Sequence, residues 1–152
     1  MRYFFRYWFP LLFWLTLIFS LSHQDGDTSS SLSNWVVSIL EFLRIDPDTL
    51  RQPVVKTLVR KAAHMTEYFI LFLLFFRLIS TIKPFKTSLV TAFLFTVAYA
   101  ATDEFHQIFI PGRLGTIFDV GIDSLGALIA LLLCVYYQRR KANNSQKKTS
   151  FV

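Results

Sequence analysis

The sequence has one cysteine, Cys134, and few charged residues for its length. A single thiol excludes an intramolecular disulfide and a cysteine-built metal site. Charged residues make up only 17% of the 152 positions and hydrophobic residues 53%, which excludes an ordinary soluble domain and indicates a bilayer. The net charge of +6 comes from Lys and Arg at the ends of apolar runs and in a tail, so it forms no basic stripe. We therefore expect no nucleic-acid partner.

Four apolar runs are long enough to cross a membrane, at about residues 3–21, 60–82, 87–105 and 116–137. About 20 apolar residues span the hydrocarbon core as a helix. A cleaved signal peptide is the alternative for the first run, but its bulky Phe and Trp residues favour a retained helix. The short connection at Lys83-Pro84 predicts an antiparallel hairpin of the second and third spans. Gly121 and Gly126 predict close helix packing in the fourth.

Two further segments complete the predicted organisation. Residues 32–43 have apolar side chains at helical spacing, typical of an amphipathic helix in the membrane interface, although covering the other helices is an alternative. Pro53 is expected in the first turn of the following helix. The polar tail, residues 142–152, is predicted to be disordered and cytoplasmic. The sequence thus predicts an all-α integral membrane protein, with a domain over residues 1–141 that contains a bundle of four transmembrane helices and one interfacial helix.

Lysine and arginine are distributed unevenly between the two predicted faces. If the N-terminus lies inside, ten of the 16 basic residues fall on the inner side and six on the outer side. This excess predicts that both termini are cytoplasmic.

Acids and histidines gather at one end of three predicted spans. Because successive spans alternate in direction, the start of the second, the end of the third and the start of the fourth share the outer leaflet. An unpaired charge there costs several kcal/mol, so these groups must pair, protonate or line a watery cavity. Arg113 lies in the turn after Pro111-Gly112. The candidate polar site consists of His64, Glu67, Asp103, Glu104, His106, Gln107, Arg113, Asp119 and Asp123.

The five acids of this site outnumber its bases, which leaves several interpretations open. A divalent metal ion, a protonated carboxylic acid or a cationic ligand would each balance the charge. Imidazole with carboxylate suits zinc or manganese, and carboxylates alone suit magnesium or calcium. A purely architectural network is the alternative: Thr116 and Asp119 have capping-box spacing, and Gly112 can supply a turn position with positive φ.

The chain has several separated motifs: residues 60–68, RKAAHMTEY, then 102–107, TDEFHQ, then 111–113, PGR, together with Asp119 and Gly126. In combination they resemble the VanZ-like family over about residues 10–135. The resemblance implies a small polytopic protein of the bacterial cytoplasmic membrane, and the founding member of the family is associated with low-level resistance to the antibiotic teicoplanin. Family members usually have asparagine at the position of Asp123. The resemblance supplies no reaction.

Three classes of function fit these observations. The first is a non-catalytic envelope factor that binds a membrane lipid or a lipid-linked cell-wall headgroup, with Arg113 on the phosphate, and so reduces glycopeptide susceptibility. The second is a metal-dependent hydrolase or transferase acting on a lipid headgroup, with Glu67 or Glu104 as general base. The third is a proton-coupled carrier in which Asp123 titrates.

Overall fold

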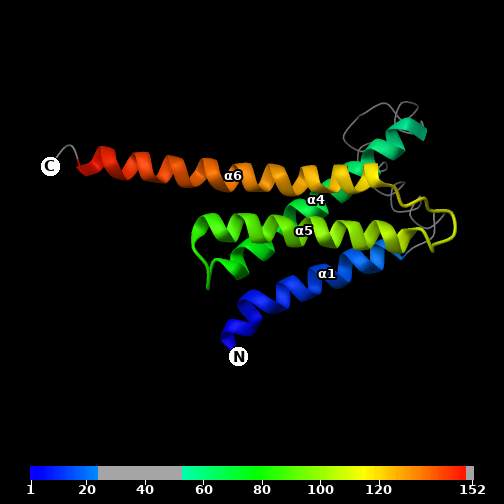
Figure 1. The fold of residues 1–152 in the computed structure, drawn as a ribbon, viewed down its shortest axis with the longest axis horizontal. Coiled ribbons are helices and arrows are strands. Elements are labelled where there is room, and N and C mark those ends of the chain that lie inside the picture. The colour runs from blue at the N-terminus through cyan, green and yellow to red at the C-terminus, as the bar shows by residue number, and fades with distance from the viewer. Residues whose placement is uncertain (24–52, 150–152) are drawn as a thin grey trace, which may run out of the picture.

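The computed structural model describes residues 1–23 and 53–149, and all regular elements in these two stretches are helical. A π-helical turn, η1 (Phe4–Trp8), leads into α1 (Phe9–Ser22), and α4 (Pro53–Ile79), α5 (Phe85–Gln107) and α6 (Ile117–Thr149) follow (Figure 1). Four stretches are long and apolar enough to span a membrane: Phe4–Ser22, Thr57–Ile79, Phe85–Gln107 and Ile117–Ser145. The predicted all-α chain with four spans is confirmed. The expected interfacial helix at 32–43 lies outside the described residues.

Helix α4 lies at the centre of the bundle, and its main partners are α6 and α5. Small residues allow α4 and α6 to approach closely: a Cβ on Gly126 would lie 2.0 Å from the carbonyl oxygen of Met65. Ala127 and Ala130 are fully buried in the same apolar core, beside Phe72. A Cβ on Gly121, in contrast, would have nothing within 4 Å of it, so the prediction that this glycine packs closely against another helix is wrong.

The N-terminal helix is joined to the bundle by side-chain hydrogen bonds to two other helices. Trp14 Nε1 donates to the carbonyl oxygen of Glu67 in α4 at 3.0 Å. Tyr99 of α5 donates its hydroxyl to the carbonyl oxygen of Leu15 at 2.7 Å. Hydrogen bonds between helices in a membrane contribute about 0.6–2 kcal/mol each. They favour the interpretation of the first run as a retained helix of the bundle.

Helix α6 is longer than the sequence suggests. It continues through residues 142–149, so the prediction of a disordered tail is wrong for those residues. Extending an existing helix avoids the cost of nucleation, which offsets the lower helix propensity of the asparagine, serine and threonine residues in this segment. Figure 1 shows both ends of the described chain, together with the α4–α5 turn, at one end of the bundle, and the α5–α6 connection and the start of α6 at the other.

Candidate functional site

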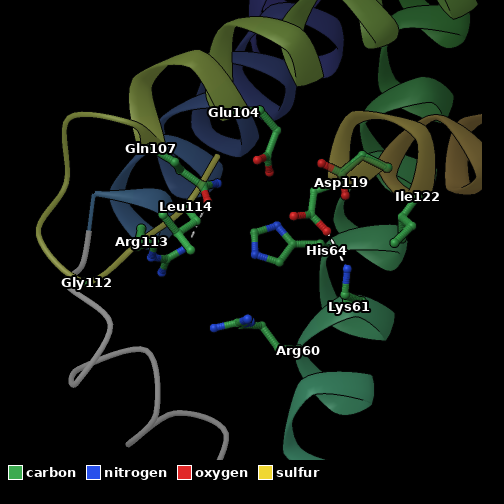
Figure 2. A pocket seen from close by; sticks show the side chains of 11 residues that line it. Arg60, Lys61, His64, Glu104, Gln107, Gly112, Arg113, Leu114, Asp119 and Ile122 are labelled. Atoms are coloured by element: carbon green, nitrogen blue, oxygen red, sulfur yellow. Dashed lines mark hydrogen bonds and ion pairs between the residues drawn. The ribbon is translucent and has the colours of Figure 1, made fainter. Parts of the chain in front are cut away.

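A cavity of ≈ 170 Å³ lies at the end of the bundle that carries the α5–α6 connection. Figure 2 shows the His64 ring among side chains from three helices and the connection between two of them. The lining residues are Arg60, Lys61 and His64 of α4, Glu104 and Gln107 of α5, Gly112, Arg113 and Leu114 of the connection, and Asp119, Ile122 and Asp123 of α6.

The α5–α6 connection is folded tightly against the end of α5. Gly112 has a φ of 74°, a conformation that costs glycine little and other residues more. A Cβ on Gly115 would lie 2.0 Å from the carbonyl oxygen of Glu104, so only glycine permits this approach. The Glu104 carboxylate accepts a hydrogen bond from the backbone N–H of Thr116 at 3.1 Å. These contacts hold Arg113 at the edge of the cavity.

Asp119 forms the N-terminal cap of α6 together with Thr116. Its backbone N–H donates to Thr116 Oγ1 at 3.2 Å, and the Thr116 hydroxyl donates to Asp119 Oδ2 at 2.8 Å. Its second carboxylate oxygen, Oδ1, accepts from Lys61 Nζ at 2.5 Å. An acid at this position also interacts favourably with the helix dipole. Both oxygens of Asp119 are therefore engaged in joining α6 to its cap and to α4.

Arg113 joins the connection to two helices while it lines the cavity. Its guanidinium donates to Gln107 Oε1 at 3.4 Å and to the carbonyl oxygen of Leu21 at 3.2 Å. Burial, with the nearby positive charge of Arg60, lowers the pKa of Arg113 from its ordinary value. The negative charges of Asp103 and Glu104 act on this pKa in the opposite direction.

Four buried side-chain atoms have no hydrogen-bond partner in the described part of the chain: His64 Nδ1, Glu67 Oε2, Tyr68 Oη and Asp123 Oδ2. The first two are 3.6 Å apart, beyond the usual hydrogen-bond distance. Asp123 is only 2% exposed and lines the cavity. Buried polar groups in proteins are nearly always satisfied, so these atoms have hydrogen-bonding capacity that no group among the described residues uses.

Asp103 lies behind the cavity, at the junction of α5 with the end of α1. It is 4% exposed, and its Oδ2 accepts from Ser22 Oγ at 2.7 Å and from Gln107 Nε2 at 3.1 Å. The sequence analysis did not identify Ser22 as a residue of the polar network. A small polar residue ending the first span, in the leaflet that holds Asp103, is the feature that could have identified it.

His106 lies on the opposite side of α5 from the cavity. Its Nε2 is 3.1 Å from His23 Nδ1, and both rings stack with Phe19 of α1. A second cavity of ≈ 170 Å³ is lined there by Phe19, Tyr99, Thr102, Asp103 and His106. His64 and His106 therefore do not share one site. Of the nine candidate residues, six line the main cavity, and Glu67, Asp103 and His106 do not.

The acids and histidines of the site do not form a donor set for a metal ion. Within residues 1–23 and 53–149, no three His, Cys, Asp or Glu side chains are arranged so that they could hold one. The site residues there consequently do not fit a resident zinc or manganese ion, which normally has three or four such ligands from the protein.

The chain is similar to a known family over most of its length. The family model described as VanZ/LLP1 matches residues 7–138, a range that includes all four candidate spans nearly in full and all residues of the cavity. Comparisons with curated proteins and with solved structures each found no match.

Proposed function

Since the chain belongs to the VanZ/LLP1 family of polytopic membrane proteins, we propose that the cavity binds the phosphate-bearing headgroup of a membrane lipid or lipid-linked cell-wall intermediate. The observation that carries this proposal is the gathering of Arg60, Lys61 and Arg113 around one small cavity at the end of four apolar helices. The protein would act without catalysis, as a factor of the cell envelope.

The two arginines are the expected phosphate ligands. Lys61 is paired with Asp119 at 2.5 Å. The Arg113 guanidinium, which donates to Gln107 Oε1 and to the carbonyl oxygen of Leu21, lines the same cavity. Arg60 makes no hydrogen bond or ion pair with the described residues, and in Figure 2 it lies below Arg113, on the same side of His64. Guanidinium groups bind phosphate through paired, charge-assisted hydrogen bonds, so two of them around one cavity form a suitable anion site.

The surroundings of the cavity favour a lipid as the source of that phosphate. Large apolar side chains beside it face outward: Leu114 is 87% exposed, Ile117 83% and Phe118 79%. Leu114 also lines the cavity. Apolar side chains at the rim of a polar site suit a ligand whose headgroup enters the cavity while its acyl or prenyl chains remain in the bilayer.

The sidedness of the site follows from the charge distribution. Both termini are predicted to be cytoplasmic, and the cavity lies at the opposite end of the bundle, so we place it in the outer leaflet. A protein that holds lipid-linked headgroups there would change how glycopeptide antibiotics reach them. We therefore expect expression in a susceptible bacterium to raise the inhibitory concentration of teicoplanin, and Arg113→Gln to abolish the increase.

Lipid binding by the purified full-length protein tests the proposal directly. Wild type, Arg60→Gln and Arg113→Gln would be compared by native mass spectrometry with phosphatidylethanolamine, phosphatidylglycerol and a polyprenyl phosphate. We expect each variant to bind its best lipid about tenfold or more weakly, because a charge-assisted hydrogen bond is lost. Arg77→Gln is the matched control, since Arg77 lies in the last turn of the same helix, far from the cavity.

Unchanged affinity in both arginine variants would contradict the proposal. A stoichiometric zinc or manganese content, lost in His64→Ala, would instead favour the metal-dependent hydrolase or transferase. Arg113→Lys separates charge from geometry: it retains the positive charge but not the paired donors. Partial recovery of binding in that variant would indicate that charge contributes to holding the headgroup.

A further inference from the structure

The main cavity is lined by charges of both signs. Three of its side chains are cationic (Arg60, Lys61, Arg113) and three are acidic (Glu104, Asp119, Asp123). In Figure 2 the Arg60 and Arg113 guanidinium groups lie below and to the left of His64, whereas the Glu104 and Asp119 carboxylates lie above and to its right. A purely anionic ligand would satisfy only one part of this lining.

Among the acids that line the cavity, Asp123 is the one with a buried oxygen that no described residue engages. It lies four residues after Asp119 on α6, is 2% exposed and has an unpartnered Oδ2. Asp119 already has its lysine and its cap. Glu104 accepts one hydrogen bond, from Thr116, and a carboxylate can accept more. A buried carboxylate is costly unless it is paired with a donor, and a cationic donor satisfies it best.

We propose that the bound headgroup is zwitterionic, with a phosphate and a primary ammonium a few atoms apart, as in a phosphoethanolamine group. This inference rests on the proposed headgroup-binding function and specifies its ligand. Arg60 and Arg113 hold the phosphate, and Asp123, assisted by Glu104, accepts hydrogen bonds from the ammonium. His64 lies between the two sets of charges (Figure 2).

The size of the cavity agrees with a headgroup of this kind. Its volume of ≈ 170 Å³ is below the roughly 300–1,000 Å³ typical of pockets for drug-sized ligands. A phosphate with a two-carbon amine is small enough for it, whereas the glycan and peptide of a cell-wall precursor are not. If a lipid-linked precursor binds, only the part next to its phosphate enters.

Lipid analogues test the inference on the wild-type protein, without reliance on a variant that fails to fold. Phosphatidylethanolamine, its N-acetylated derivative and phosphatidylglycerol, all with the same acyl chains, would be compared in native mass spectrometry. We expect phosphatidylethanolamine to bind about tenfold or more tightly than the other two, because only it supplies a cationic donor to Asp123. Asp123→Asn retains the shape of the side chain and should reduce this preference to about threefold or less.

The outcomes separate this inference from the function on which it rests. If the three lipids bind equally, and Arg60→Gln and Arg113→Gln weaken all of them, the zwitterion assignment is overturned while headgroup binding stands. If no lipid binds, the proposed function fails as well. Soluble phosphoethanolamine, added as a competitor, identifies the source: displacement of the lipid shows that the headgroup alone is recognised. No displacement, together with a retained preference for phosphatidylethanolamine, shows that the acyl chains are needed as well.

Discussion

Substitution of Gly126 by alanine tests the central helix contact of the bundle. The added Cβ would lie 2.0 Å from the carbonyl oxygen of Met65, whereas ordinary contacts begin at 3.4 Å. The contact is with backbone, which no side-chain rotation can relieve, so α4 and α6 must separate locally by about 1 Å or more. Neighbouring residues in the same core, Ala127 and Ala130, are fully buried and would lose contacts as the helices separate.

Gly121→Ala provides a matched control on the same helix. Nothing lies within 4 Å of the Cβ position there, so that substitution gains helix propensity, up to about 1 kcal/mol, without a clash. Both variants gain the same propensity, and overpacking of a tight interface costs about 1–3 kcal/mol. We therefore expect Gly126→Ala to be about 1–3 kcal/mol less stable than Gly121→Ala, roughly a 5- to 150-fold difference in the unfolding equilibrium constant.

Reversible unfolding in mixed micelles, driven by SDS and followed by tryptophan fluorescence or circular dichroism, would measure both free energies of unfolding. Equal stability of the two variants would show that α4 and α6 do not approach as closely as described. We do not expect a side-chain substitution elsewhere in the interface to restore the stability of Gly126→Ala, because the clash is with the backbone of Met65.

Three further substitutions test the polar contacts, each measured by the same unfolding titration. Ser22→Ala should lower the free energy of unfolding by about 1 kcal/mol, because it removes a buried interhelical hydrogen bond to the Asp103 carboxylate. Ser20→Ala is the control and should have little effect, since it loses only a bond within its own helix. Equal losses in the two variants would contradict the assignment. Thr116→Val should cost about 1 kcal/mol through loss of the α6 cap, with recovery in Thr116→Ser. Lys61→Met should change stability by less than about 1 kcal/mol, since the ion pair is partly exposed; a much larger loss would mean that the pair is shielded from solvent.

Hydropathy and charge alone determine the four spans and the end of the bundle at which the polar residues gather. The reason is physical: a bilayer requires about 20 apolar residues for each span, and short connections force neighbouring spans to be antiparallel. The prediction that His64, Glu104 and Asp119 lie at one end follows from those two constraints. Six of the nine candidate residues line one cavity, although whether they bind a ligand is still a prediction.

The rotation of each helix about its axis could not be predicted from the sequence. A span that is apolar on all sides has no polar stripe that identifies its buried face, so the partner of His106 was undetermined, and it proved to be His23 at 3.1 Å. Gly121 and Gly126 differ for the same reason: they lie five residues apart on α6, and only Gly126 faces α4. The cross-chain contact of Ser22 with Asp103 depends on the same rotations.

The structure separates the acids of the site by their hydrogen-bond partners, which the sequence does not show. Asp103 and Asp119 are satisfied by partners from other segments, at 2.7 Å from Ser22 and 2.5 Å from Lys61, so their removal would leave a neighbouring donor unpaired. Asp123 is as deeply buried as Asp103 but has an oxygen without a partner among the described residues, a condition that costs stability unless a ligand supplies the missing donor. This difference is the reason why we propose a ligand contact for Asp123 and an architectural role for Asp103 and Asp119.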